Sequence, residues 1–200
     1  MKNYIYIPLV NALVVLSLVS LGGCVRPLIP PEPLQYSCLS ESQTPSQNPN
    51  APVIRHACAI DRGIYGTILK IYLEADDPNG DMFKIATTVD QVGYGHYPTD
   101  FIMVKPEYRK AFRGYIQWHT FSPNAAILPE WNYVTVRVAV VDMKGYTSNE
   151  FEFRFTFETG TGPEPKPPAP FDQGDLPKLG NVSINLYNPF HNGGGADMRD

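Results

Sequence analysis

Two runs of alternating apolar residues constrain the fold of this chain more than any other feature. Between Trp131 and Phe157 the apolar positions are Val134, Val136, Val138, Val140, Phe151, Phe153, Phe155 and Phe157. Because successive side chains of a strand point to opposite faces, each run has one apolar face and one largely polar face. The intervening Asp142 and Gly145 predict an antiparallel return of the chain. Eight apolar side chains on one face need a second layer to cover them.

Further short strand patterns, separated by turn residues, precede this pair. The predicted strand 66–75 has an inward face formed by Leu69, Ile71, Leu73 and Ala75. The predicted strand 82–92 has an inward face formed by Phe83, Ile85, Thr87 and Val89. We expect strands at 53–60, 66–75, 82–92, 101–104 and 112–121, a turn at 61–63, a loop at 94–98 and at most a helical turn at 106–111. Seven short strands without a convincing helix predict an all-β fold, an antiparallel β-sandwich over residues 50–158 that folds on its own.

Three motifs in this region resemble the bacterial extracellular immunoglobulin-like modules of the cadherin-like and PKD-like group. They are an Asn-x-Pro-Val opening at Asn50, the loop Ala-Asp-Asp-Pro-Asn-Gly-Asp ending at Asp81, and a valine run that continues through Asp142 and Gly145 to Ser148. The resemblance spans about residues 50–158 and implies an immunoglobulin-like sandwich. It specifies the fold more closely than the function.

The first residues read as a targeting segment and not as part of the fold. Lys2 precedes an apolar run from Ile5 to Leu21, and the sequence Leu-Gly-Gly-Cys ends at Cys24. This ending resembles the lipobox of bacterial lipoproteins, which implies that residues 1–23 are a signal peptide and that Cys24 is lipidated. Val25, where Asp would mark inner-membrane retention, favours the outer membrane of the cell envelope. The alternative is a transmembrane anchor, since seventeen residues nearly span a bilayer.

Prolines concentrate on both sides of the predicted domain. Six lie between Pro27 and Pro49 and five between Pro163 and Pro170. Because proline cannot donate to a sheet ladder, we expect residues 24–49 to be a tether and residues 159–200 a proline- and glycine-rich tail. Within that tail, the alternating stretch 181–187 could add to a sheet edge in this protein or in a partner.

The two remaining cysteines, Cys38 and Cys58, are predicted to form a disulfide, because the predicted compartment is oxidising. The bond would add roughly 3 kcal/mol to the free energy of unfolding by the loop-entropy relation. It would also attach the tether covalently to the first strand of the domain. The alternative is a pair of free thiols. The cysteine and histidine spacing does not fit a zinc site.

One cluster of oxygen-bearing side chains has the composition of a calcium site. Loops at the same end of a sandwich would gather them, and calcium takes 6–8 oxygen ligands. The alternative is that these side chains cap turns through backbone amides. The candidate ligands are Asp76, Asp77, Asn79, Asp81 and Asp142, and we expect no other cofactor.

Two classes of function remain. With 16 basic and 20 acidic residues and no basic run, the chain does not fit a nucleic-acid-binding surface. No nucleophile elbow, zinc-protease, P-loop or dinucleotide motif occurs, so we expect a non-catalytic envelope module that binds a protein or glycan partner. The alternative is a small envelope hydrolase, or its accessory subunit, using histidines and aspartates.

The middle of the predicted domain is rich in aromatic residues, which could form a binding platform or pack in the core. These residues are Tyr94, His96, Tyr97, Tyr108, Tyr115 and Trp118.

Overall fold

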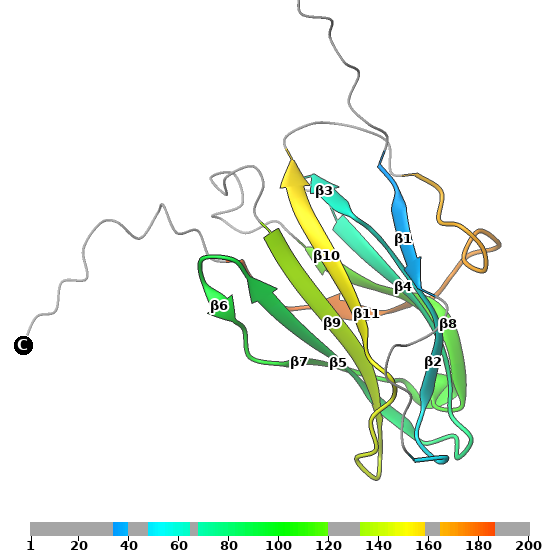
Figure 1. Cartoon of the computed structure of the whole chain (residues 1–200). Coiled ribbons are helices and arrows are strands. Elements are labelled where there is room, and N and C mark those ends of the chain that lie inside the picture. Colours follow the sequence, from blue (N-terminus) through cyan, green and yellow to red (C-terminus); the bar gives the residue numbers. More distant parts are fainter. Residues whose placement is uncertain (1–33, 40–47, 65–67, 120–132, 159–164, 187–200) are drawn as a thin grey trace, which may run out of the picture. The chain divides into compact units, whose positions relative to one another are not determined.

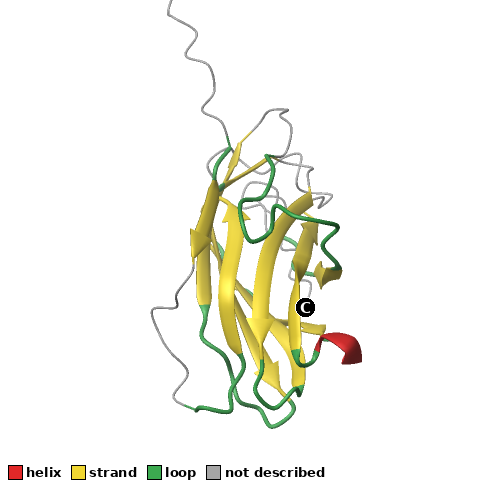
Figure 2. Ribbon diagram, turned by 90° about the vertical axis from the view of Figure 1, so that its right-hand side faces the viewer, coloured by secondary structure: helices red, strands yellow, loops and turns green. Residues whose placement is uncertain are grey.

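The computed structural model of the chain describes residues 34–39, 48–64, 68–119, 133–158 and 165–186. Across them the chain forms two stacked β-sheets with an apolar core between, so the predicted all-β sandwich is confirmed (Figure 1). The one helical element in this described part is a single 3-10 turn, η1 (Pro106–Tyr108), which stands out in Figure 2 against the strands. The predicted signal peptide and Cys24 lie outside the described residues.

The first sheet contains five strands. Its spatial order is β1 (Tyr36–Leu39), β2 (Val53–Ile60), β4 (Ile68–Asp76), β8 (Ala111–His119) and β11 (Lys178–Val182). All neighbours are antiparallel except β8 and β11, which run parallel. The sheet is therefore mixed at one edge.

The second sheet contains the valine and phenylalanine strands at its centre. Its order is β3 (Arg62–Ile64), β10 (Phe151–Glu158), β9 (Tyr133–Asp142), β5 (Met82–Gln91) and β6 (Gly95–His96), and β7 (Asp100–Met103) also pairs with β5. β3 runs parallel to β10, and the other pairs are antiparallel.

The predicted antiparallel pair is confirmed, and so is the side to which its apolar residues point. Phe153 lies opposite Val136, and Phe155 lies opposite Val134, so both apolar faces point to the same side of the sheet. All eight alternating side chains are at most 2% exposed. They pack on the inward face of β4, which Leu69, Ile71, Leu73 and Ala75 form as predicted.

One inward position of β5 was predicted wrongly. Ile85, Thr87 and Val89 are buried, but Phe83 is only partly buried and Met82 takes its place in the core. The ladder with β9 shifts register between Met82 and Lys84. Because a bulge inserts one extra residue into the strand, the alternation predicted from residue 85 onward does not extend past it.

The residues predicted as a turn at 61–63 instead carry the chain from one sheet to the other. The Asp61 N–H donates to the Gln35 carbonyl beside the first sheet, and the Asp61 carbonyl accepts from the Thr156 N–H in the second (3.1 Å each). Arg62 and Gly63 then pair with β10 as the edge strand β3. Asp-Arg-Gly has turn chemistry, but this register with β10 is a long-range contact that local sequence does not show.

Both proline-rich flanks contribute to the sandwich beyond the predicted limits of 50–158. At the front, β1 pairs with β2, and Cys38 lies directly opposite Cys58, to which it is disulfide-bonded. At the back, β11 pairs with β8. Only the first two residues of the predicted edge-adding stretch 181–187 therefore join a sheet of this protein, because the strand begins at Lys178 and ends at Val182.

The segment 165–186, here called the C-terminal strap, also covers the outer face of the first sheet. Phe171 is 1% exposed and packs on Tyr72 at a ring-centroid distance of 5.5 Å. Tyr36 donates to the Pro165 carbonyl (3.1 Å), and the Trp118 indole donates to the Ile184 carbonyl (2.7 Å). Tyr72, predicted on the polar face of its strand, is consequently only 5% exposed.

Candidate functional site

The acidic loops do lie together at one end of the sandwich. The Met143 N–H donates to the Asp81 carbonyl at 3.0 Å, which joins the loop after β4 to the loop after β9. Asp77 and Asp142 are each 2% exposed, and Asp81 is partly buried. Buried oxygens of Asp81 and Asp142 have no hydrogen-bond partner in the structure.

Most of the bonds that these carboxylates make are turn caps. Asp77 accepts from the N–H groups of Asn79 (3.1 Å) and Asp81 (2.8 Å). Asp142 accepts from the N–H groups of Lys144 (2.9 Å) and Tyr146 (2.8 Å). This bonding is what the capping interpretation predicts.

The side chains of two of the five candidate calcium ligands are bonded to groups outside the carboxylate cluster. Asp76 forms a two-pronged ion pair with Arg55 (2.5 and 3.0 Å), and the Asn79 amide donates to the Asn50 carbonyl at 3.1 Å. Within the described segments, no group of three or more His, Cys, Asp or Glu side chains is arranged to hold a metal ion. The calcium site therefore stays a prediction.

The crowding of carboxylates shows in the pKa of Asp81. Burial raises this pKa, and a hydrogen bond and charge repulsion from Asp77 raise it further, as does the charge of Asp142. Lys144, whose ammonium lies 3.9 Å from the carboxylate, opposes the rise. The ionised form of Asp81 is thus disfavoured in the folded protein.

Asp81→Asn is expected to raise the melting temperature at neutral pH in calcium-free buffer. Because the folded-state pKa is raised, ionisation of Asp81 costs stability at pH values above it. The advantage of the variant should disappear as the pH falls toward the ordinary aspartate pKa of about 3.9. Thermal melts between pH 3.5 and pH 8 measure this, and a variant that is less stable at every pH would contradict it.

The same pair of proteins tests calcium. Extracellular modules bind calcium at roughly 10⁻⁴–10⁻³ M, so the melts are repeated with and without millimolar calcium. A bound ion would raise the wild-type melting temperature by several degrees and leave the variant unchanged. If the wild-type melting curves with and without calcium superimpose, the carboxylates of the cluster only cap turns.

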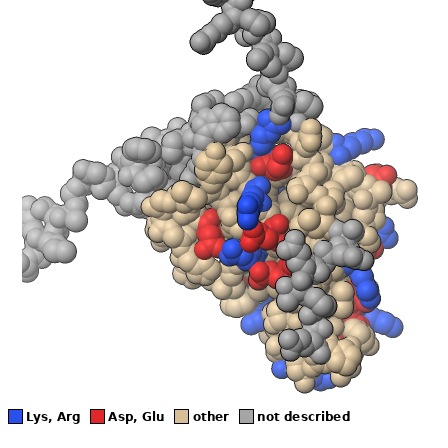
Figure 3. Space-filling view, in the orientation of Figure 1, with Lys and Arg blue, Asp and Glu red and all other residues tan. Residues whose placement is uncertain are grey.

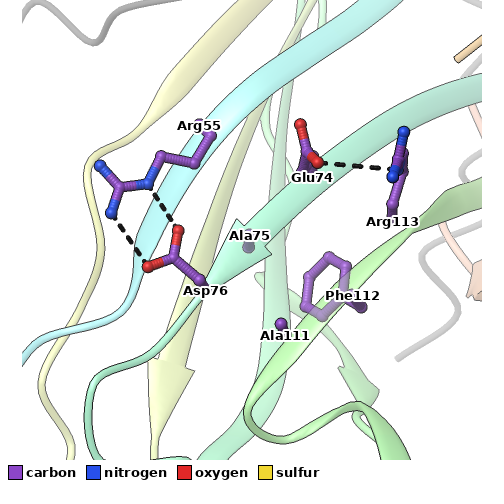
Figure 4. A pocket seen from close by; sticks show the side chains of 7 residues that line it. All are labelled: Arg55, Glu74, Ala75, Asp76, Ala111, Phe112 and Arg113. Atoms are coloured by element: carbon purple, nitrogen blue, oxygen red, sulfur yellow. Dashed lines mark hydrogen bonds and ion pairs between the residues drawn. The ribbon is translucent and has the colours of Figure 1, made fainter. Parts of the chain in front are cut away.

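A shallow groove of about 270 Å³ crosses the outer face of the first sheet (Figure 4). Its charged side chains face one another: Arg55 pairs with Asp76, and Arg113 lies 3.6 Å from Glu74. His56 also bonds to Glu74, at 2.8 Å. The positive and negative side chains of the groove therefore neutralise one another. Its lining is Arg55, Glu74, Ala75, Asp76, Ala111, Phe112 and Arg113.

A band of alternating charges crosses the outer face of the second sheet (Figure 3). Asp90 is paired with His96 (2.8 Å) and with Arg137, and these contacts lower the pKa of Asp90. Arg137 continues to Glu152 at 3.0 Å, which also binds Arg154 at 3.1 Å. Exposed ion pairs contribute only about 0–1 kcal/mol each to stability. Because the positive and negative side chains of the band are paired, this part of the face is polar but does not favour a ligand of either charge.

Beside the charge band lies an apolar area that the sequence analysis did not identify. On β7, Phe101 is 49% exposed and Met103 is 53% exposed. Ala86 lies opposite Phe101 in the neighbouring strand, and Lys84 lies opposite Met103. We call Phe101, Met103, Ala86 and Lys84 the β7 patch. Its one sequence signal was the short strand predicted at 101–104, in which Phe101 and Met103 alternate as large apolar residues.

The aromatic-rich middle does not form one platform. Trp118 and Tyr97 are buried, and Tyr115 contacts Tyr72 in the cluster under the strap. Tyr108 packs against the core, while Tyr94 is exposed and stacks on Tyr97 at 4.5 Å. Packing therefore explains most of these side chains. His119 is exposed at the end of β8, and His191 lies outside the described residues.

No family model matches this chain, and no curated protein sequence matches it either. Over the part of the chain that is described, no helix has the length and apolar character needed to cross a membrane. The apolar run from residue 5 to residue 21, for which a transmembrane anchor was the alternative to a signal peptide, falls outside that part.

Proposed function

We propose that this protein is a lipid-anchored component of the bacterial envelope, held in the outer membrane through Cys24. Its sandwich is then a non-catalytic, immunoglobulin-like module that binds a partner in an envelope assembly. The lipobox-like sequence before Cys24 supports the anchor. The β7 patch is the observation that carries the binding role, because its two large apolar side chains, Phe101 and Met103, are about half exposed to solvent.

The composition of the β7 patch favours a protein partner over a glycan. The Lys84 ammonium lies 4.0 Å from the centroid of the Phe101 ring, so a cation already occupies one face of that ring. A sugar would need a free ring face on which to stack. The edge of Phe101 and the flexible Met103 side chain instead suit an apolar protein surface.

Cys24→Ala is expected to abolish incorporation of radiolabelled palmitate. The thiol is the proposed acylation site, and each buried methylene contributes about 0.8 kcal/mol to membrane attachment. Labelling of cells that express wild type or variant, followed by precipitation of the protein, measures this. Cys38→Ala is the control and should retain the label, whereas equal labelling of the Cys24 variant would refute the anchor.

The binding role is tested by photo-crosslinking in living cells. A photoreactive residue in place of Phe101 should give one discrete protein adduct, and Met103→Asp should reduce that adduct at least tenfold. Ala111, exposed on the other sheet, is the control position and should give no such adduct. If position 101 yields no adduct, or Met103→Asp leaves it unchanged, the β7 patch is not a docking surface.

A further inference from the structure

A second exposed apolar group lies at one end of the second sheet, away from the β7 patch. Val92 is 68% exposed, Tyr94 is 49% exposed and Tyr133 is 55% exposed. The Val92 N–H donates to the Tyr133 carbonyl at 3.0 Å, so the turn after β5 lies against the start of β9. We call Val92, Tyr94 and Tyr133 the apolar tip.

The backbone holds the apolar tip open to its surroundings. Gly93 and Gly95 have φ angles of +87° and +117°, a conformation that other residues adopt rarely, and a Cβ at either position would have no atom within 4 Å. The Tyr94 N–H donates to the Gln91 carbonyl at 3.1 Å, and its ring stacks on the buried Tyr97. Val92 and Tyr94 therefore project from a fixed turn.

The tip carries no net charge of its own. No Asp, Glu, Lys, Arg or His occurs between Gln91 and Gly95. The flanking residues, Asp90 and His96, are bonded to each other at 2.8 Å. A valine and a tyrosine in this turn, with a second tyrosine at the neighbouring start of β9, match the composition that favours the membrane–water interface, where a ring is buried and its hydroxyl stays hydrated.

The apolar tip lies at the end of the sandwich where the described chain begins. Gln35 is bonded to Asp61, Asp61 is bonded to Thr156, and Thr156 is the register partner of Tyr133. The Val92 N–H donates to the Tyr133 carbonyl, so Val92 is the last residue in this series of neighbours. Neighbouring strands are about 4.8 Å apart, so four such steps separate Gln35 from Val92 by roughly 20 Å. In Figure 1, β1 begins and β10 ends in the upper half of the molecule, where the β5–β6 turn also lies.

The length of the chain before Leu34 limits how far that end can be from a lipid at Cys24. A fully extended residue spans at most about 3.6 Å, so the ten steps from residue 24 to residue 34 reach at most about 36 Å. The bilayer that holds the acyl chains therefore lies within reach of the tethered end.

We propose that the apolar tip contacts the interface of the membrane to which Cys24 is anchored. The sandwich would then meet the bilayer at two places, the acyl group and the tip, with the β7 patch free for a partner. This inference rests on the proposed lipidation. A protein bound to the tip is the competing outcome.

The test uses the full lipidated chain in vesicles of phosphatidylethanolamine and phosphatidylglycerol that contain a photoactivatable lipid. After illumination, mass spectrometry should find lipid adducts on the peptides that contain residues 92–94 and residue 133. Val92→Ser/Tyr94→Ser should lower tip labelling at least fivefold. The control Met143→Ser/Tyr146→Ser changes side chains 52% and 40% exposed at the opposite end, and should leave tip labelling unchanged.

The outcomes separate the two proposals. The mass of the amino-terminal peptide reports acylation by itself, so an unlipidated chain refutes the anchor without reference to the tip. Adducts confined to the lipidated peptide of an acylated chain overturn the tip contact. Adducts to a protein instead of lipid, obtained in native envelopes with a photoreactive residue at position 92, also overturn it. Val92→Ser alone, which leaves the Tyr94–Tyr97 stack intact, should lower labelling in a protein whose melting temperature is unchanged.

Discussion

A chain that ends at Glu158 is expected to lose the cooperative unfolding transition of the full-length protein. Truncation removes the C-terminal strap and leaves the edge of β8 unpaired. Trp118 loses the acceptor of its indole N–H, and such an unsatisfied buried donor costs about 1–3 kcal/mol. The four buried strap residues that pack on the core are lost with it: Leu179, Val182, Ile184 and Leu186.

The size of the effect follows from the marginal stability of domains. A fully buried aliphatic side chain contributes about 1.5–3 kcal/mol, and a whole domain has about 5–15 kcal/mol. The freed segment regains conformational entropy, which offsets part of the loss. We still expect a region cut to residues 50–158, which also lacks β1 and the disulfide, to be unfolded or aggregated. A sharp urea transition at the full-length midpoint would show that the strap is dispensable.

Two point variants isolate the strap without shortening the chain. Phe171→Ala removes a fully buried ring and should cost about 3–5 kcal/mol. Gly180→Val should displace β11, because a Cβ at Gly180 would overlap the Ile102 side chain. Asp172→Ala and Asn181→Ala, exposed neighbours of the two sites, are the matched controls and should unfold within about 0.5 kcal/mol of wild type.

Val138→Asp is expected to destabilise the sandwich by more than about 4 kcal/mol at neutral pH. Val138 is fully buried at the centre of β9, between Phe151 of β10 and Thr87 of β5. A carboxyl there stays protonated because burial disfavours the charged form. Holding it neutral about 3 pH units above its ordinary pKa costs about 1.36 kcal/mol per unit.

The pH dependence distinguishes this charge effect from lost packing. Since the folded-state pKa is raised, the penalty should shrink as the pH falls toward about 3.9, and the packing loss alone should remain. Urea titrations at pH 4 and pH 7 measure both parts. Thr135→Asp, on the outward face of the same strand, is the control and should have a small effect at either pH. An unchanged midpoint for Val138→Asp would mean that the facing of β9 is wrong.

The sequence by itself determined the central strands and the inward face of β4. Period-two alternation is a local property, so Val136 and Phe153 could be assigned to one buried face without knowing their neighbours. The turn chemistry of Asp77 and Asp142 was also readable, because each caps amides only two and four residues away. The pairing of Cys38 with Cys58 was predictable from the count of cysteines and the expected compartment.

Only the tertiary structure decided which strands lie at the edges of the sheets and which outward side chains are buried. Tyr72 alternates as a polar-face residue, and it is buried because Phe171, far along the chain, covers it. Phe101 and Met103 have the same apolar character as core residues, yet they are 49% and 53% exposed on the outer face of β7. Whether an outward side chain is covered depends on where a distant segment returns. Local alternation carries no information about that return, and the contacts that decide it are made only when the whole chain has folded.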